Sequence, residues 1–192
     1  MTEGLPTVLD LKARVGSAVI GEVFAYWATF FEKGSLPAFE DVEPWKIKRA
    51  LPYVWIWRRD QADDRFYCRI CGEQVNYILG RNISGKAADE VLPADMAAEA
   101  QARWRRLIDE RLAHHLVGCV YNFADQQVMG ERVILPLAPS RNDRGGVLGV
   151  TDADQTRLRL VSPVDPSKFV GMGIGERRDY DADPAHRGAA QP

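Results

Sequence analysis

The 192-residue chain has little cysteine and histidine, three residues of each, and no strong excess of either charge. Three cysteines cannot all pair and no secretion leader opens the sequence, so we expect a reduced, cytoplasmic protein. The formal net charge of −2 gives no overall basic field, so we expect no nucleic-acid partner. The most apolar stretch, residues 18–31, is shorter than the ~20 residues of a bilayer span, so we expect no membrane partner.

Length and composition fit one folded domain with extensions at both ends. Hydrophobic residues make up 46% of the chain, enough for a core without disulfides or metal. We predict an N-terminal helical extension over residues 1–50, a core over residues 51–153 and a C-terminal extension over residues 154–192. The last dozen residues are rich in proline, glycine and charge, and we expect them to be disordered.

An apolar helix is predicted over residues 17–31. Ser17 is a suitable N-cap, and the following apolar residues recur with the 3.6-residue period of a helix: Ile20, Val23, Phe24, Trp27 and Phe31. The helix carries few charges, so its apolar circumference exceeds what one sheet face easily covers. We therefore predict a homodimer that forms through this N-terminal helix. A short helix is expected next, beginning near Pro44 and closed by Pro52.

The remaining elements predict an α+β fold. Strands are expected at residues 53–58 and 65–71, a long helix at residues 94–112, and strands at residues 116–124, 131–137 and 146–151. Strands that are grouped rather than alternating with helices form antiparallel sheets. Both parities of the first strand are apolar, so both faces of the sheet should be covered.

Three segments together resemble a known family. Residues 65–86, RFYCRICGEQVNYILGRNISGK, combine a strand, a glycine, a short helix and a glycine-punctuated turn. They follow YWATFFEKGSLPAFEDVEPWKIKRALPYVWIW at residues 26–57 and precede ERVILPLAP at residues 131–139. This order resembles a PAS domain, and more closely the bacterial group catalogued as PAS family 5. The resemblance covers roughly residues 17–152.

The resemblance implies both a fold and a function. The implied fold is a five-stranded antiparallel sheet, with helices over one face, a potential ligand cavity beneath them and the N-terminal helical extension on the other face. The implied function is a sensory module for signal transduction, which binds a small molecule or a signalling protein and has no defined catalytic residues.

The expected cavity has six candidate lining residues: Tyr53, Trp55, Tyr67, Arg69, Asn76 and Trp104. Arg69 would anchor an anionic ligand, because a guanidinium binds carboxylate or phosphate through two parallel hydrogen bonds. An internal pair of Arg69 with Glu73 or Asn76 is the favoured alternative. The ligand and any cofactor stay unidentified. Haem bound through His114 or His115 is disfavoured, because both follow the long helix, where their charged forms favour its C-terminal end.

Two other motifs have ordinary structural interpretations. Cys68 and Cys71 have the spacing of a redox or zinc pair, but residues three apart on a continuous strand face opposite sides. Buried structural cysteines are therefore expected, and no metal site. The basic run Arg103, Arg105 and Arg106 is more typical of a solvated helix face than of a phosphate site.

Two alternative functions stay open. A small enzyme would use Cys119 and His115 as a thiol–imidazole pair. On a strand their Cα atoms would lie ~13 Å apart, too far for direct proton transfer, so we predict no catalytic activity. A structural adaptor for protein–protein interaction would instead fill the cavity with its own side chains.

Overall fold

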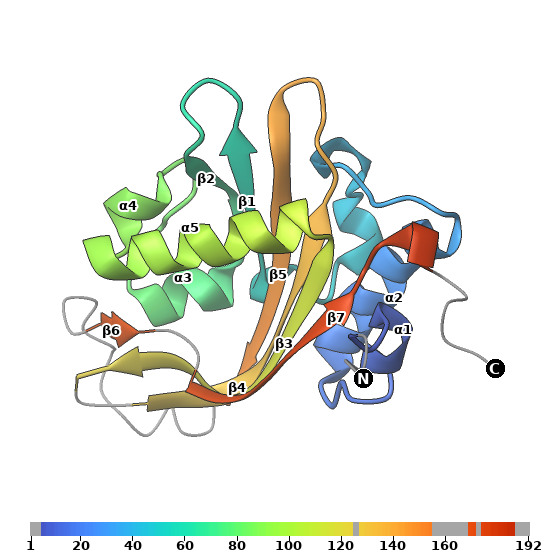
Figure 1. The fold of residues 1–192 in the computed structure, drawn as a ribbon. Helices are drawn as coiled ribbons and strands as arrows, with labels where there is room; N and C mark the ends of the chain where they lie inside the picture. Colours follow the sequence, from blue (N-terminus) through green and yellow to red (C-terminus); the bar gives the residue numbers. More distant parts are fainter. Residues whose placement is uncertain (1–4, 125–126, 155–168, 172–173, 187–192) are drawn as a thin grey trace.

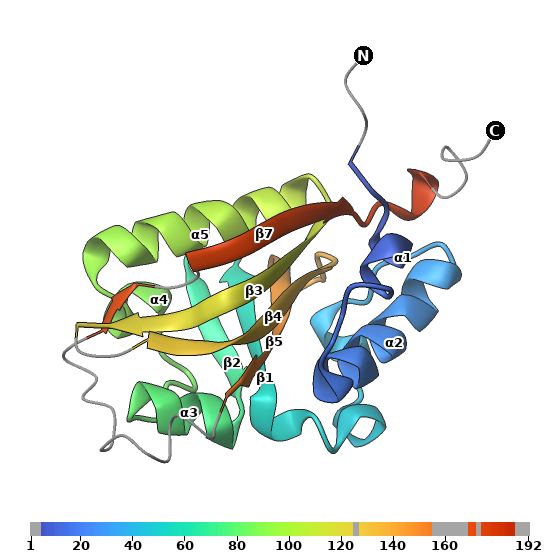
Figure 2. The ribbon, with the colours of Figure 1, turned by 90° about the horizontal axis from the view of Figure 1, so that it is seen from below.

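A twisted antiparallel sheet forms the middle layer of the computed structural model, which describes residues 5–124, 127–154, 169–171 and 174–186 (Figure 1). The order across the sheet is β2-β1-β5-β4-β3-β6, and β7 also pairs with β3. Helices cover both faces (Figure 2). The α+β class predicted from the sequence is therefore correct, and the sheet is wider than the five strands expected.

The elements have the following bounds. The strands are β1 (Val54–Asp60), β2 (Phe66–Cys71), β3 (Leu112–Phe123), β4 (Gln127–Leu137), β5 (Asp143–Ala153), β6 (Phe169–Gly171) and β7 (Ile174–Asp181). The α-helices are α1 (Val8–Leu11), α2 (Ala18–Glu32), α3 (Glu73–Leu79), α4 (Ala88–Val91) and α5 (Ala94–Asp109). In place of the short helix expected near Pro44 there are three 3-10 turns, η1 (Phe39–Asp41), η2 (Pro44–Ile47) and η3 (Leu51–Tyr53). None of the described helices is long and apolar enough to cross a bilayer.

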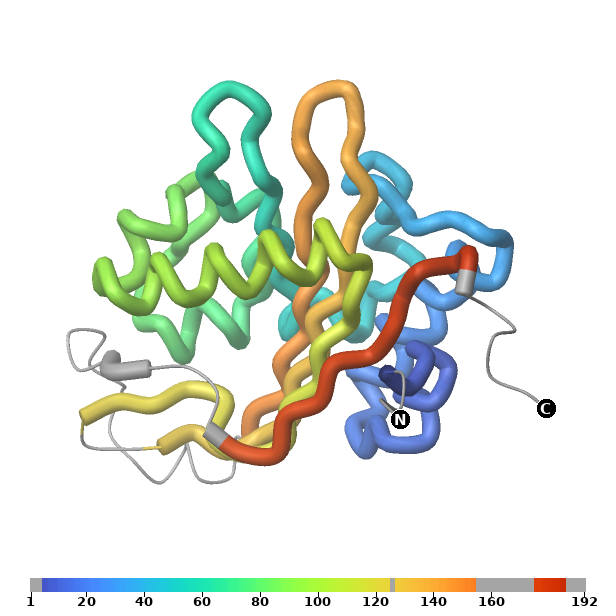
Figure 3. The backbone as a smooth tube through the Cα atoms, in the orientation of Figure 1, coloured from blue at the N-terminus to red at the C-terminus, as the bar shows by residue number. Residues whose placement is uncertain are grey.

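The two additional strands come from the C-terminal extension. Strand β7 runs along the outer edge of β3, as the path of the chain in Figure 3 shows, and pairs with it from Leu112 to Cys119. The exposed charged residues of β7 suit an edge strand, because charge discourages further strand pairing. Residues 184–186, within the end predicted to be disordered, form a 3-10 turn, and residues 187–192 lie outside the described residues.

The sheet separates two hydrophobic cores. In β1, Trp55 and Trp57 belong to the core beneath α3, α4 and α5, whereas Val54 and Ile56 belong to the core beneath α1 and α2. This alternation follows from the period of two along a strand. It confirms the prediction that both faces of the sheet are covered.

Helix α2 packs against its own sheet. Ser17 accepts a hydrogen bond from the backbone N–H of Ile20, as an N-cap does. The indole Nε1 of Trp27 donates to the Pro136 carbonyl over 3.0 Å, and its side chain is fully buried. The apolar residues assigned to this face are all buried within the chain. One chain thus covers these residues by itself, and the homodimer through this helix stays a prediction.

Helix α5 ends three residues earlier than predicted. Arg111 adopts a left-handed conformation with φ of 51°, and β3 begins at Leu112. Because the strand starts there, His114 and His115 lie within the sheet rather than at the helix end. Each pairs with a carboxylate on a neighbouring strand: His114 Nδ1 lies 2.7 Å from Asp179, and His115 Nε2 lies 2.8 Å from Glu131.

Candidate ligand cavity

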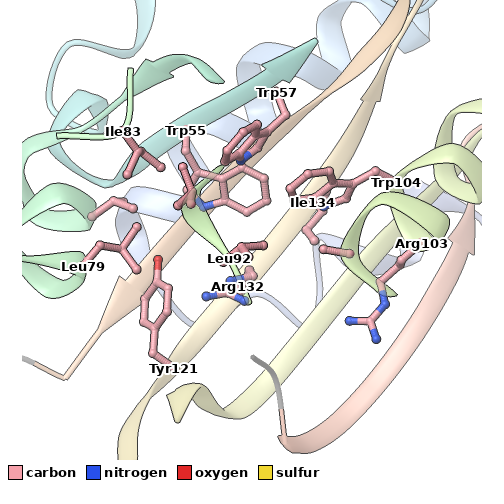
Figure 4. Close-up of a pocket in the computed structure, with 13 residues that line it drawn as sticks. Trp55, Trp57, Leu79, Ile83, Leu92, Arg103, Trp104, Tyr121, Arg132 and Ile134 are labelled. Carbon is pink, nitrogen blue, oxygen red and sulfur yellow. The ribbon is translucent and has the colours of Figure 1, made fainter. Parts of the chain in front are cut away.

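A cavity of about 50 Å³ lies between the sheet and helices α3, α4 and α5 (Figure 4). On this scale one enclosed water needs roughly 10–15 Å³, so the cavity has room for a few waters or a compound of similar size. Most of the lining is apolar, and Figure 4 shows Arg132 between the other two polar side chains, Tyr121 and Arg103. The lining residues are Trp55, Trp57, Val75, Leu79, Ile83, Val91, Leu92, Ala100, Arg103, Trp104, Tyr121, Arg132 and Ile134.

Three tryptophans form the aromatic wall. Trp57 stacks on Trp104 of α5 with ring centroids 5.1 Å apart, and Trp55 lies 6.2 Å from the same ring. Trp55 and Trp57 reach this side because they alternate with Val54 and Ile56 along β1. Offset aromatic pairs of this kind add to the stability that area burial provides. The wall is therefore a rigid surface against which an apolar ligand group can pack.

The polar end of the cavity is built around Arg132 of β4. Its guanidinium donates through Nε to the Thr151 hydroxyl over 2.9 Å and through Nη2 to the Val120 carbonyl over 2.7 Å. It also lies 4.6 Å from the centre of the Tyr121 ring. The residue is 4% exposed, and no carboxylate among the described residues forms an ion pair with it.

Electrostatics at this end are dominated by burial. Burial lowers the pKa of Arg132, and the nearby charge of Arg103 lowers it further, whereas Tyr121 opposes the shift. Burial likewise raises the pKa of Tyr121, and the charge of Arg132 opposes that increase. A buried cation surrounded by neutral acceptors is poorly compensated, so the site favours the approach of an anion.

Two of the six residues predicted from the sequence line this cavity, Trp55 and Trp104. Tyr53 ends the 3-10 turn before β1, so strand alternation does not extend to it, and it packs toward α2. The Asn76 side chain donates to the Cys71 carbonyl and accepts from the Ile83 N–H, which holds the turn after α3. These two residues support the cavity walls or the opposite core rather than facing the cavity.

Tyr67 and Arg69 are also outside the cavity. Tyr67 lies opposite Arg58 in the strand pair, on the face away from Trp57, and its hydroxyl donates to Asp63 over 2.7 Å. Arg69 is exposed and forms no ion pair with any described residue, Glu73 included. The internal pair expected for Arg69 is therefore absent from the described structure, and Arg132 supplies the buried cation.

A β-bulge at Arg69 explains this displacement. Ile56 lies opposite Ile70, and Trp57 lies opposite Cys68, so Arg69 is an extra residue in β2. The bulge reverses the strand parity that the sequence implied for the two cysteines. Cys68 now shares a face with Trp57, and Cys71 shares that face with Trp55. The hydrogen bond with Cys68, followed by burial, raises the pKa of the Cys71 thiol, which disfavours a reactive thiolate.

The proposed thiol–imidazole pair is not assembled. The Cys119 thiol donates to the Tyr121 carbonyl over 3.0 Å, and burial raises its pKa. His115 pairs with Glu131 instead. No group of three or more His, Cys, Asp or Glu side chains in the described part of the chain is arranged to bind a metal.

Arg132 was not among the residues predicted for the site, although the sequence carries a signal for it. In ERVILPLAP the arginine falls on the same strand parity as Ile134, whereas Val133 and Leu135 fall on the other. An arginine within an otherwise apolar strand that is covered on both faces must be buried. The sequence predicts a solvated helix face for Arg103, whereas the structure places this residue half-buried in the lining of the cavity.

Comparison with solved structures gives weak likeness over part of the chain. VqmA bound to DPO matches with 18% identity and a TM-score of 0.40, over 57% of this chain and 56% of that chain. A Vibrio cholerae VqmA dimer without its target DNA matches with 16% identity and a TM-score of 0.40, over 60% and 53%. This chain thus spans about half the length of these structures. No curated protein sequence matches significantly.

The second comparison contradicts one expectation. That VqmA structure is described as informing the DNA-binding mechanism of LuxR-type receptors, whereas we expected no nucleic-acid partner for this chain. The expectation depended on net charge, which averages over the surface and says nothing about a local basic patch. We therefore withdraw it.

Comparison with family models gives a specific result. The model of the PAS family 5 group, described as PAS domain, matches residues 16–152. The match extends from the residue before the N-cap of α2 to the penultimate residue of β5, and it includes the cavity and most of both cores. It covers most of the 192 residues. The chain belongs to the PAS domain family.

Proposed function

We propose that this PAS domain is a sensory module that takes a small anionic compound into the cavity beneath α3, α4 and α5. The observation that carries the proposal is the buried guanidinium of Arg132, which has no carboxylate partner among the described residues and borders an apolar cavity. A few convergent polar groups in a mostly apolar cavity are the usual composition of a small-molecule site.

The cavity dimensions restrict the ligand. A volume of about 50 Å³ suits a compound of a few non-hydrogen atoms, such as a short-chain carboxylate. Its anionic group would lie at Arg132 and Tyr121, and its carbon chain would pack against Trp55 and Trp104. A carboxylate matches a guanidinium because both are planar and can share two parallel hydrogen bonds.

We further propose that the module binds without catalysing a reaction. The thiol of Cys119 is engaged by a backbone carbonyl, and the imidazole of His115 is engaged by Glu131. General acid–base or nucleophilic chemistry requires partners within about 3 Å of one another and of the reacting atom. Neither residue lines the cavity.

A second candidate function is a structural adaptor whose cavity is largely filled by its own side chains. The small volume favours this alternative, because three tryptophans already occupy much of the space between the sheet and α5. In an adaptor, the Arg132 guanidinium would serve only to join β4, β5 and β3 through Thr151 and Val120.

Ligand binding can distinguish the two functions. Native mass spectrometry and an absorbance scan of freshly purified protein would reveal a co-purifying compound. Two- to five-carbon carboxylates, each matched with its alcohol, would then be titrated and followed by NMR. We expect a carboxylate to bind and its alcohol to bind at least about tenfold more weakly, the loss of one charge-assisted contact. If no acid binds and no compound co-purifies, the adaptor function is favoured.

Two variants test the position of the ligand. Arg132→Gln should abolish carboxylate binding, whereas Arg69→Gln, which removes an exposed arginine outside the cavity, should leave it unchanged. Because Arg132→Gln can also destabilise the sheet, Val91→Phe provides an independent test. The larger side chain fills the cavity and leaves the charged lining residues, Arg103 and Arg132, unchanged. Undiminished binding in folded Val91→Phe protein would place the ligand elsewhere.

A further inference from the structure

A second, basic groove of about 240 Å³ lies on the outer side of α5, between this helix and β7. Figure 2 shows α5 and β7 alongside each other at this edge of the molecule. The groove is lined by residues of α5, β3 and β7: Arg103, Arg106, His114, Arg177, Arg178 and Asp179. Four of the six are arginines, although the chain as a whole has a net charge of −2.

The single carboxylate in the lining is already compensated. Asp179 accepts from Arg106 Nη1 over 2.7 Å, and its other oxygen lies 2.7 Å from Nδ1 of His114. The hydrogen bond with His114, followed by that with Arg106, lowers the pKa of Asp179. Asp179 therefore fixes β7 against α5 and β3, and it leaves the charge of the other arginines largely uncompensated.

Arg103 and Arg177 are the cations available for a ligand. Arg177 is exposed and forms no ion pair with any described residue. Arg103 pairs with Glu99 over 2.7 Å, but the Glu99 side chain is 67% exposed, so solvent screens this pair. Arg103 and Arg177 both line the groove, and after burial the charge of Arg177 is the largest cause that lowers the pKa of Arg103.

Strand parity separates Arg177 from Arg178. Tyr180 is fully buried in the core beneath α1 and α2, and Arg178, two residues earlier, has the same strand parity although it also borders the groove. Arg177 and Asp179 have the opposite parity and point toward α5, where Asp179 meets Arg106. Arg103 and Arg106 are three apart on α5 and share one helix face. Figure 4 shows Arg103 extending from α5 on the side where β7 passes.

We propose that this groove binds a phosphate-type dianion between Arg103 and Arg177, with Arg106 at its edge. A planar carboxylate is satisfied by one guanidinium, whereas a tetrahedral phosphate presents oxygens in diverging directions to cations on two separate elements. The dianion would also relieve the repulsion between Arg103 and Arg177. Arg103 lines both the groove and the internal cavity, whereas Arg106 and Arg177 line only the groove, so a change at Arg177 tests this site separately from the anion proposed for the cavity.

NMR titration of the ¹⁵N-labelled full chain tests the proposal. Inorganic phosphate would be added at about pH 8, where the dianion predominates, and compared with chloride at equal ionic strength; a phosphate ester, whose second pKa is about 6, is also dianionic there. We expect saturable shifts at residues 103, 106 and 177 with phosphate alone. A phosphoserine peptide and its unphosphorylated form would then show whether the dianion binds better free or on a protein.

Three arginine variants locate the site. Arg177→Gln should weaken phosphate binding about tenfold, the effect of one charge-assisted contact, whereas Arg69→Gln should have no effect. Arg178→Gln should weaken binding less than Arg177→Gln, because Arg178 borders the groove but has the strand parity opposite to that of Arg177. Equal shifts with phosphate and chloride would overturn the proposal. So would an equal loss in Arg69→Gln and Arg177→Gln, which would show general ionic attraction only.

Discussion

Trp55 and Arg132 donate hydrogen bonds to the same acceptor, the hydroxyl of Thr151, over 3.0 and 2.9 Å. All three residues are buried, and they come from β1, β4 and β5, three neighbouring strands of the sheet. Thr151 therefore links the aromatic wall of the cavity to its polar end. A change at this one hydroxyl should alter both the stability of the sheet and the position of the buried guanidinium.

The first prediction concerns this shared acceptor. Thr151→Val keeps the shape of the side chain but leaves Trp55 Nε1 and Arg132 Nε without their partner, so we expect a loss of about 2–4 kcal/mol in unfolding free energy. Thr151→Ser keeps the hydroxyl and should lose much less. Urea unfolding followed by circular dichroism would measure both. Equal stability of the valine variant and wild type would show that the hydroxyl contributes little.

The second prediction concerns the stacked wall. Trp104 is 3% exposed and contacts the rings of Trp55, Trp57 and Phe66. Trp104→Ala should lower the unfolding free energy by about 3–5 kcal/mol, the usual cost of removing a large buried ring, and Trp104→Phe should lower it less. A small effect of the alanine change in thermal unfolding would mean that the ring borders open space instead of a closed core.

The third prediction concerns Gly149 of β5. A Cβ atom at this position would overlap the indole of Trp55, so glycine is required for the ring to lie across the strand. Gly149→Ala should destabilise the fold by roughly 1–3 kcal/mol, as overpacking does. The double variant with Trp55→Phe should recover part of that loss. If the two losses simply add, the overlap with Trp55 is not the cause.

The sequence predicted the elements that have strong local patterns. The alternation of Val54, Trp55, Ile56 and Trp57 predicted a strand covered on both faces, and the structure confirms it. The apolar period beginning after Ser17 predicted α2, and the grouping of strands predicted an antiparallel α+β fold. In each case the pattern repeats along the element, so the period is legible without knowledge of its neighbours.

The sequence did not predict features that depend on pairing between distant segments. Strand β7, IGERRDYD, is mostly polar and charged, and only Tyr180 shows that part of it is buried. The bulge at Arg69 leaves no mark on the sequence, because a single extra residue in β2 is visible only from its register with β1. Without this extra residue, strand alternation predicted Cys68 and Cys71 on opposite faces of the sheet. The bulge reverses the parity between them and places both on the same face.

The last prediction concerns the pH dependence of stability at Asp179 of β7. His114 of β3 and Arg106 of α5 contact this carboxylate directly, and Arg103 and Arg177 line the same groove. Its pKa is lowered in the folded state by these partners, His114 first. Between the folded and unfolded pKa values the unfolded chain therefore binds more protons than the native one, so stability increases with pH there.

This stabilisation should be complete above about pH 5 and should be lost as the pH falls through the lowered folded value. Asp179→Asn removes the charge and should lower the unfolding free energy by about 1–2 kcal/mol near neutral pH. The difference between wild type and the variant should shrink on acidification below about pH 4, because the protonated carboxyl resembles the amide. Urea midpoints measured from pH 7 to pH 2.5 would follow it. A gap that stays constant over the whole range would show that the contacts of Asp179 are steric or dipolar and do not depend on its charge.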